Sequence, residues 1–450
     1  MMLTLATLLL TAVQDGGGVF ALRVKRAETI AQGPLEHALI LVEGGKIVEI
    51  GEDLPVERGI PVYEFTDWVA TPGLVNCHTR IGSERGIVAR AFEPQATPEL
   101  EIDPKSDVWE ELLELGVTTL GYYPEGSGIP GQAFALQPYG KTLAEMLVLE
   151  PAYLKVVLQS SASSKNMLRE AFQKADEYEE KVKKEREKWE KEQEKKKSKS
   201  KSKKDDEKKD EAKEKESEKK DDEKKEGASS PAAEDGDKKA DDKPGADVFV
   251  PPEPDERVRP FLELRKQTLT AMMSLRKAAD YLHLLDVIEK EEDVEWFVQF
   301  PLQDDIDFFE VAAKMGEKKL LAVTQPELTL QPNSLRERNI PAELARAGVK
   351  VAFVPRQDTV SGHEDWLPDV GRLVGQGLPR DAALAGLTLE PARALGLEER
   401  LGSLEKEKDA NIVLWSGDPL EPSSRVQAVL LAGKFVVGSP NERARSREDK

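Results

Sequence analysis

The sequence predicts an α/β protein in which a parallel sheet or barrel forms the centre of the chain and further strands come from both ends. Short apolar strands alternate with helical segments between residues 109 and 395. Strand patterns also precede this region, at residues 19–74, and follow it, at residues 411–438. A highly charged segment interrupts the alternation, so we expect a folded protein that carries an insert.

The N-terminus begins with a short apolar run, residues 1–13, which is followed by Gln14, Asp15 and three glycines. A helix that spans a bilayer needs about 20 apolar residues, so this run is too short to cross a membrane. It resembles the apolar core of a secretory signal, and we predict a signal peptide at residues 1–14 and export to the periplasm or the extracellular space. A buried first strand or a misassigned start codon is the alternative, and the protein is then cytoplasmic. No other segment of the sequence is apolar enough to predict a membrane span.

The strand segments before residue 74 carry a hairpin signal. The Gly44-Gly45 pair lies between two runs rich in strand-forming residues, HALILVE and KIVEIG. In the central region, residues 109–122 indicate an amphipathic helix, a glycine cap at Gly116 and a buried strand. Further strands are expected at residues 294–300, 320–323 and 349–354, and helices at 261–290, 304–315, 341–347 and 379–395, the last split by Pro391.

The charged segment is unlike the rest of the chain. Residues 181–226 hold 38 charged residues in 46, of which 21 are basic and 17 acidic. Its first part contains strong helix formers with too few apolar positions for a coiled-coil seam, and residues 198–245 cannot bury a core. We therefore predict a low-complexity insert at residues 181–246, helical at its start and disordered afterwards, and favour a tolerated loop expansion over a partner-binding tail.

The composition excludes several function classes. The formal net charge of the whole chain is -20, which argues against a nucleic-acid binder, because phosphate contacts need a basic excess. A single cysteine, Cys77, excludes an internal disulfide framework and any cluster of cysteine ligands. The chain has four histidines: His37, His78, His283 and His363.

Two segments resemble the amidohydrolase superfamily, and the segment LGVTTLGYYPEGSGIPGQ is similar to its imidazolonepropionase-like branch. TPGLVNCHTRIG, residues 71–82, resembles the first barrel strand of that family, and LTLEPARALGLEERLGSLEKEKDANIVLWSGDPL resembles its closing segment. The resemblance implies a TIM-like (β/α)8 barrel, with distortion allowed, at residues 71–180 and 247–399. It also implies a small composite β-sandwich at residues 15–70 and 400–438, which leaves residues 439–450 as a disordered tail.

The resemblance implies a metal-dependent hydrolase of carbon–nitrogen bonds other than peptide bonds. Two histidines spaced i, i+2 on the first strand, two more from strands 5 and 6 and an aspartate from strand 8 hold the metal, which activates a water molecule. Here the first pair reads His78-Thr79-Arg80, and Arg80 stays protonated and repels a cation. Gln299 and Pro301 stand where the family has the strand-5 histidine, and Gln325 stands where it has the strand-6 histidine. Asn76 replaces the aspartate of the first-strand signature, whereas Asp358 is retained at the end of strand 8. Four barrel histidines cannot be assembled from this chain.

The remaining candidates each have a plain structural interpretation. Asp358 and Arg80 are the catalytic candidates, and we hypothesise that they pair, the guanidinium replacing the charge of the metal. His78 and His363 are the metal candidates, with residual zinc as the metal. The favoured interpretation of His78 is a hydrogen-bonded residue at a strand end, and that of His363 is a residue of a solvated loop (residues 362–366). We expect no resident cofactor. Cys77 precedes His78 directly and is expected to pack in the barrel wall.

Three functions remain open. The favoured one is an inactive amidohydrolase-like protein that acts as a binding protein, its partner an intact amidohydrolase relative or a second copy of the chain. The second is an active hydrolase with a reduced or metal-free site, in which Arg80, His78 and Asp358 act as electrophile, acid–base group and general base. The third is a scaffold whose charged insert binds partners.

Overall fold

The computed structural model describes residues 18–83, 88–214, 248–302 and 306–440. The chain divides into two compact units, one made of Met1–Ala171 and Glu256–Lys450 and the other of Phe172–Asp255. The predicted signal peptide, residues 215–247 of the predicted insert and the last ten residues of the predicted tail lie outside the described residues. Within the described residues, no helix combines the length and the apolar character that crossing a membrane requires.

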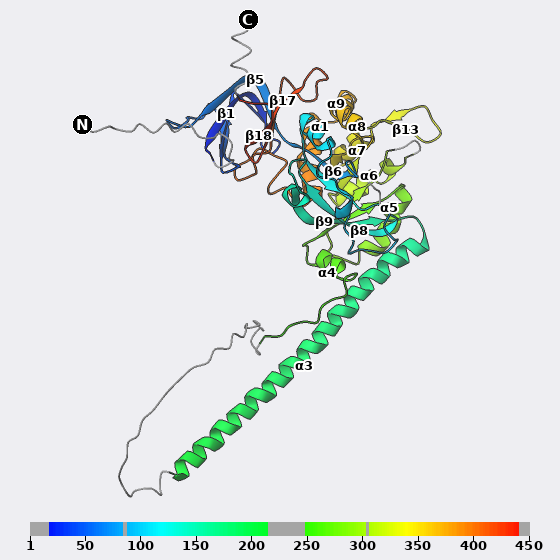
Figure 1. The fold of residues 1–450 in the computed structure, drawn as a ribbon. Helices are drawn as coiled ribbons and strands as arrows, with labels where there is room; N and C mark the ends of the chain where they lie inside the picture. The colour runs from blue at the N-terminus through cyan, green and yellow to red at the C-terminus, as the bar shows by residue number, and fades with distance from the viewer. Residues whose placement is uncertain (1–17, 84–87, 215–247, 303–305, 441–450) are drawn as a thin grey trace, which may run out of the picture. The chain divides into compact units, whose positions relative to one another are not determined.

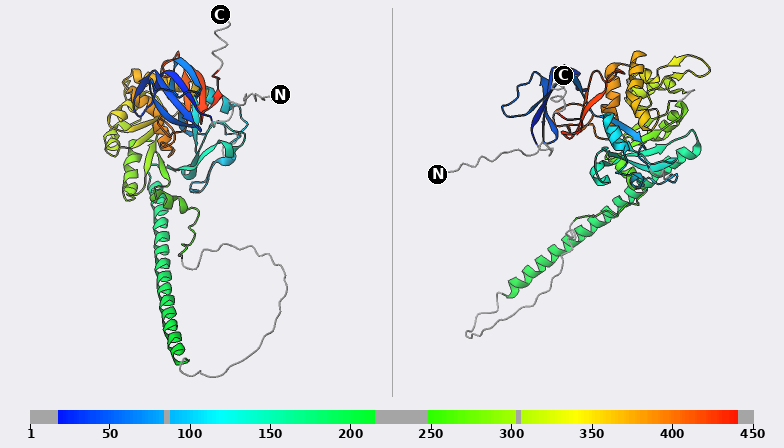
Figure 2. Two further views of the ribbon diagram at one scale, coloured as in Figure 1. Left: turned by 90° about the vertical axis from the view of Figure 1, so that its left-hand side faces the viewer. Right: turned by 45° about the horizontal axis from the view of Figure 1, so that its top comes forward.

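One sheet of the first unit joins the two ends of the chain. It has eight strands: β1 (Phe20–Glu28), β2 (Pro34–Glu36), β3 (Ala38–Glu43), β4 (Lys46–Glu52), β5 (Val62–Pro72), β16 (Ile412–Trp415), β17 (Val426–Leu431) and β18 (Lys434–Val437). The order is β18-β17-β16-β5-β1-β3-β4, with β2 on β1. Early strands (blue) and late strands (red) lie side by side (Figures 1 and 2). The predicted composite element is therefore a single hydrogen-bonded sheet, with Phe65, Leu414 and Leu430 in one buried cluster.

A second sheet of eight strands is nearly closed into a barrel. Its strands are β6 (Leu74–Thr79), β7 (Val117–Tyr122), β8 (Gly128–Leu136), β9 (Leu147–Val157), β10 (Thr270–Ser274), β11 (Trp296–Gln299), β12 (Leu321–Thr324) and β15 (Lys350–Phe353). They follow one another in chain order from β6 to β15, and all pair in parallel except β8, which is antiparallel to both neighbours. Short connections on both sides of β8 permit only antiparallel pairing. The barrel thus differs from the expected array of eight parallel strands.

The helices lie mostly on the connections of this barrel. They are η1 (Glu99–Glu101), α1 (Val108–Glu114), α2 (Leu143–Met146), α4 (Arg259–Arg265), α5 (Ala278–Ile288), η2 (Phe308–Glu310), α6 (Ala312–Glu317), α7 (Ile340–Arg346), α8 (Val360–Glu364), α9 (Trp366–Gly375), α10 (Arg380–Leu387) and α11 (Leu389–Ala394), and a small hairpin pairs β13 (Thr329–Leu330) with β14 (Glu337–Arg338). Local sequence fixes their ends. The Asn339 side chain accepts the N–H of Ala342 at the start of α7, and Gly116 adopts a positive φ of 82° just after α1.

One expected helical segment contains a strand. Residues 261–290 form α4 and α5, but β10 lies between them, paired with β9 and β11. The residues of β10, TAMMS, include good helix formers, so local propensity favours a helix. Burial of this segment between two strands overrides that preference, because the sheet hydrogen bonds and side-chain packing are gained together.

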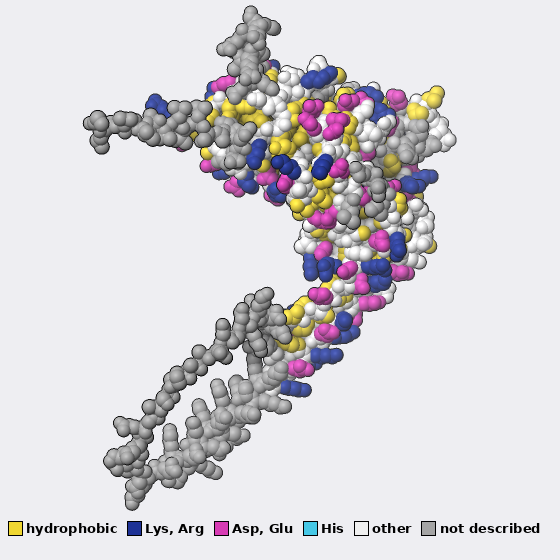
Figure 3. All heavy atoms as spheres, in the orientation of Figure 1, with side chains coloured by type: hydrophobic (Ala, Val, Ile, Leu, Met, Phe, Trp, Pro, Cys, Tyr) yellow, Lys and Arg dark blue, Asp and Glu magenta, His cyan; other side chains and the backbone are white. Residues whose placement is uncertain are grey.

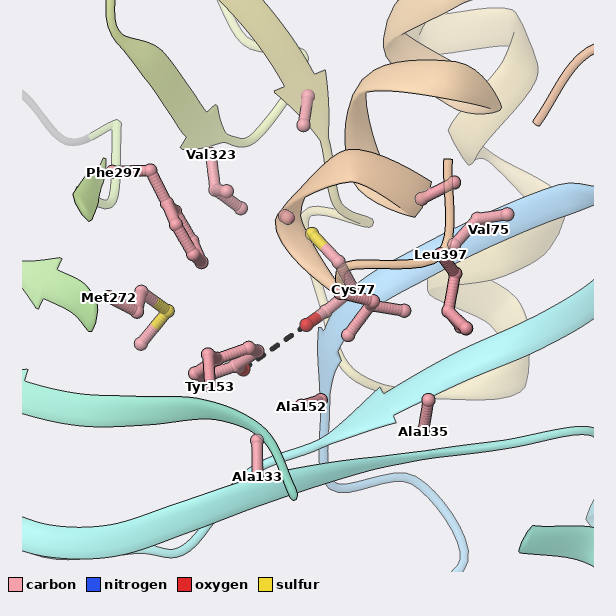
Figure 4. Close-up of a cluster of buried hydrophobic side chains, with 14 of the residues drawn as sticks. Val75, Cys77, Ala133, Ala135, Ala152, Tyr153, Met272, Phe297, Val323 and Leu397 are labelled. Atoms are coloured by element: carbon pink, nitrogen blue, oxygen red, sulfur yellow. Dashed lines mark hydrogen bonds between the residues drawn. The ribbon is translucent and has the colours of Figure 1, made fainter. Parts of the chain in front are cut away.

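Apolar side chains fill the interior of the barrel. The cluster takes Val75 and Cys77 from β6, Tyr153 from β9, Phe297 from β11 and Val323 from β12, all nearly inaccessible to solvent (Figure 4). Residues two apart on a strand face the same side, so this cluster also shows which strand residues point inward. Two residues after the interior positions of β9, β10 and β11 come Lys155, Ser274 and Gln299, which also point inward. These polar side chains make the mouth of the barrel polar.

The second unit consists largely of a long helix. Helix α3 (Ala162–Glu214) enters it at Phe172, and side chains of both charges gather along it (Figure 3). Some form ion pairs one turn apart, such as Lys184 with Glu180, at 3.1 Å. The segment after residue 247 returns to this helix. The Tyr178 hydroxyl donates to the carbonyl of Pro252 at 2.7 Å, and the rings of Trp189 and Phe249 lie 6.0 Å apart. Helix α3 covers the expected helical start of the insert.

Candidate functional site

His78 lies at the mouth of the barrel, near the end of β6. Its Nδ1 is 3.0 Å from the hydroxyl of Tyr153, and that hydroxyl donates its single proton to the carbonyl of Cys77 at 3.1 Å. Nδ1 is therefore the protonated nitrogen of the imidazole, and Nε2 keeps its lone pair. The ring stacks on Tyr123 with centroids 3.7 Å apart. Burial, and next the charges of Lys155 and Arg80, hold the pKa of His78 well below its usual value, so the ring is neutral.

Arg80 carries its positive charge into the same mouth and finds acidic partners there. One guanidinium nitrogen forms a very short contact with Glu101 of η1 and lies 3.6 Å from Glu125, and the other donates to the carbonyl of Tyr123 at 2.9 Å. The Arg80 and Glu101 side chains are 11% and 3% exposed, so this ion pair is largely shielded from water. Because the sequence places Glu101 in an irregular stretch between two strands, no periodic pattern marks it as a functional residue.

Asp358 follows β15 and reaches across to the end of β6. Its carboxylate accepts the hydroxyl of Thr79 and the backbone N–H of Arg80 in two very short hydrogen bonds. The hypothesis of a side-chain pair between Arg80 and Asp358 therefore needs correction: the carboxylate meets the backbone of Arg80, whereas the guanidinium pairs with Glu101. Asp358 links the first and last strands of the barrel sheet through hydrogen bonds outside the strand ladder.

His363 is buried in α8, which corrects the expectation of a solvated loop. Thr359 begins this helix, and its hydroxyl accepts the N–H of Gly362 at 3.0 Å. The imidazole Nδ1 donates to the carbonyl of Thr359 at 2.8 Å, and Nε2 accepts from the amide of Asn76 at 3.0 Å. Both ring nitrogens are thus used. Burial lowers the pKa of His363, against the raising effects of the Thr359 carbonyl and Asp358.

Two further residues of the interior complete the site, one expected and one not. Cys77 is buried as expected, but it lies in the interior cluster with Tyr153 and not in the barrel wall. Burial raises the pKa of its thiol to about 12, which keeps it protonated and unreactive. Lys155 of β9 was not predicted. Its ammonium group donates to the carbonyl of Pro124 at 3.2 Å and lies 3.9 Å from the centre of the Tyr123 ring. A lysine among apolar residues in the strand AYLKVV was the signal that could have identified it.

The residues at the mouth do not fit the metal that the family resemblance implies. Among the residues that the structure describes, no three His, Cys, Asp or Glu side chains are grouped so that they could hold a metal ion. The amide oxygens at the strand-5 and strand-6 positions are occupied, since Gln299 accepts the hydroxyl of Ser274 at 2.7 Å and Gln325 accepts the N–H of Leu302 at 2.8 Å. A fixed guanidinium in the same mouth opposes any divalent cation.

Comparisons with known proteins agree with the architecture. Residues 307–439 match the Amidohydrolase family. The crystal structure of an amidohydrolase from Thermotoga maritima MSB8 superposes with a TM-score of 0.68 at 20% identity, covering 93% of this chain and all of that one. A structure of an uncharacterized protein gives a TM-score of 0.52 at 12% identity, over 94% of this chain and all of that one.

One curated relative matches over a short stretch. It is "Amidohydrolase tasK" of Hapsidospora irregularis, 39% identical over 74 residues. The match covers 15% of this chain and spans only 8% of the length of that relative. The family match is confined to residues 307–439, and the solved amidohydrolase shares the fold of this chain.

Proposed function

We propose that this protein is a binding protein on an amidohydrolase fold, which neither holds a catalytic metal nor hydrolyses carbon–nitrogen bonds. The observation that carries the proposal is the ion pair between Arg80 and Glu101 at the barrel mouth. Arg80 stands at the position where the resemblance implies a metal-binding imidazole. Its guanidinium is a permanent cation and already has a carboxylate partner in Glu101.

The neighbouring groups support the same proposal. Hydrolysis of an amide needs a water molecule activated by a metal or by a free base. Asp358 already accepts hydrogen bonds from the hydroxyl of Thr79 and the backbone N–H of Arg80, so both carboxylate oxygens are engaged. His78 keeps only Nε2 available, and both nitrogens of His363 are engaged. Binding surfaces survive such changes, because fold and site chemistry are separable.

The partner that we propose is an intact amidohydrolase relative or a second copy of the chain. Light scattering of the purified protein separates these cases, since a homo-oligomer has a multiple of the chain mass. Co-expression with an amidohydrolase from the same source tests the other case by co-purification. A protein that stays monomeric and co-purifies with no relative would contradict the partner role.

Metal content and hydrolysis test the catalytic part of the proposal. After dialysis against a weak chelator, we expect far less than one zinc, iron, manganese or nickel per chain by elemental mass spectrometry. We also expect no hydrolysis of amide, cyclic amide or imide substrates above a heat-unfolded control. One tightly held metal per chain together with turnover would overturn the proposal.

Arg80→His provides a matched variant for this test, because it restores the His-x-His spacing on β6. We expect the variant to remain metal-free, since Gln299 and Gln325 still occupy the positions of the other imidazoles. Stoichiometric metal in Arg80→His would show that the arginine alone keeps the metal out.

A metal-free hydrolase is the second candidate, and it is favoured by the neutral imidazole of His78 lying in the same mouth as Asp358 and the amine of Lys155. Turnover that survives chelator and disappears in Asp358→Asn would support this function.

We retain export as a prediction, tested by the N-terminal sequence of the secreted protein. The insert role is tested by deleting residues 181–246, which we expect to leave every partner bound.

A further inference from the structure

Lys155 places a primary amine inside the barrel mouth. It lies on β9 two residues after Tyr153, whose ring belongs to the interior cluster, so both side chains point inward. Only 6% of the residue is exposed. The ammonium nitrogen has two close contacts, the Pro124 carbonyl at 3.2 Å and the face of the Tyr123 ring at 3.9 Å.

Within the described part of the chain, Lys155 forms no ion pair with a carboxylate, unlike other lysines of the same unit. Lys165 lies 3.3 Å from Asp286, and Lys46 lies 3.7 Å from Asp409. Burial without such a partner, and next the charge of Arg80, lower the pKa of Lys155 to about 7, although Glu125 acts in the opposite direction. The amine of Lys155 is therefore neutral far more often at neutral pH than that of an ordinary lysine.

We propose that Lys155 is a covalent binding site for small uncharged aldehydes and ketones, which it captures as an imine. The amine nitrogen adds to the carbonyl carbon, and its proton moves to the oxygen to give a carbinolamine. Loss of water from the carbinolamine then leaves a carbon–nitrogen double bond. No oxidant, reductant or metal enters this step, and the reaction reverses by hydrolysis.

The surroundings suit this chemistry. The charge of Lys155 contributes to the lowered pKa of His78, and the unprotonated Nε2 of the neutral imidazole can relay the proton from the amine nitrogen to the carbonyl oxygen. On the neighbouring strand the hydroxyl of Ser274 donates to Gln299, so its oxygen can accept a hydrogen bond from the hydroxyl of the carbinolamine.

The charge at the mouth selects the class of carbonyl compound. The guanidinium of Arg80 is already balanced by the carboxylates of Glu101 and Glu125. The carboxylate of Asp358 adds a further negative charge nearby. An anionic ligand such as a keto acid would meet these carboxylates, and the guanidinium of Arg80 is already paired, which is why we infer an uncharged ligand.

Reductive trapping tests the proposal. The full-length protein is treated at neutral pH with propionaldehyde and sodium cyanoborohydride, which converts an imine to a stable N-propyl group, and is then analysed by peptide mapping. We expect Lys155 to be alkylated at least about tenfold faster than Lys165, because an ordinary lysine holds roughly a thousandth of the neutral amine or less. The N-terminal amine, with an ordinary pKa near about 8, is counted separately.

Two controls make the outcome decisive. Lys155→Met should remove the fast labelling, and Lys165→Met should leave it unchanged. In guanidinium chloride the preference for Lys155 should vanish, since it depends on the fold, and this control needs no variant. Equal labelling of Lys155 and Lys165 in the folded protein, or none at Lys155, would overturn the proposal. Because the reaction needs neither metal nor partner, it is tested separately from the proposed function.

Discussion

Replacing Glu101 by Gln removes one charge of the ion pair at the barrel mouth and leaves the guanidinium of Arg80 without its closest carboxylate. Removing one partner of a buried pair costs about 3–5 kcal/mol, because the other charge stays buried. Arg80 keeps the Tyr123 carbonyl at 2.9 Å and Glu125 at 3.6 Å, and the Glu125 side chain is half exposed. We therefore expect a loss near the lower end, about 3 kcal/mol of unfolding free energy.

The assay is urea unfolding followed by tryptophan fluorescence. A matched control is Glu64→Gln, which breaks the surface pair with Arg23, where the side chains are 44% and 52% exposed and the atoms 3.2 Å apart. We expect that control to cost less than about 1 kcal/mol. The double variant Arg80→Met with Glu101→Leu should recover part of the loss, because neither charge remains. Equal midpoints for Glu101→Gln and Glu64→Gln would refute the argument that the mouth is shielded from water.

Three other predictions concern the barrel interior. The pKa of Lys155 is about 7 in the folded chain and near 10.5 when unfolded, so the folded state binds fewer protons between these values. The stability of the wild type relative to Lys155→Met should therefore rise with pH across that interval, by up to about 1.4 kcal/mol per pH unit, and a flat difference would contradict the assignment. Tyr153→Phe removes the hydroxyl's two hydrogen bonds and should cost about 1–2 kcal/mol in urea unfolding. Tyr281→Phe should cost almost nothing, because its buried hydroxyl has no partner within the described residues. Gly121→Ala would bring a Cβ within 2.3 Å of a backbone oxygen of β6 and should lower the melting temperature, by roughly 1–3 kcal/mol of stability, whereas Gly375→Ala meets nothing within 4 Å and should be neutral or slightly stabilising.

The fold was largely predictable because hydrophobic periodicity and turn residues report on local structure. The segments before Leu74 and after Asn411 predicted strands, and the structure joins them in one sheet. What local pattern could not predict was partner choice. The residues of β8 do not themselves mark it as antiparallel, although its short connections to β7 and β9 do, and β10 has a local preference for helix. The outcome for β10 depends on its pairing with β9, which is distant in the sequence.

The site divides in the same way. His78, Arg80 and Asp358 could be found because their segments resemble the strands of the amidohydrolase superfamily, whose site residues lie at or just after the carboxyl ends of the barrel strands. Glu101 could not, since it reaches Arg80 from a short turn in an irregular segment. His363 was assigned to a loop because its neighbours are polar, yet the Thr359 cap begins a helix there and buries the ring.

The carboxylate of Asp358 also has a consequence for how the chain folds. Its hydrogen bond to Thr79 joins residues 279 positions apart in the sequence, whereas each neighbouring pair of barrel strands is much closer along the chain. Joining such distant residues in the unfolded chain costs the conformational entropy of closing a very long loop. This cost falls once the intervening strands have paired and shortened the loop, so the hydrogen bond stabilises the chain only then. The barrel should therefore close last, after the ladder from β6 to β15 has formed, and during synthesis only once Asp358 has left the ribosome.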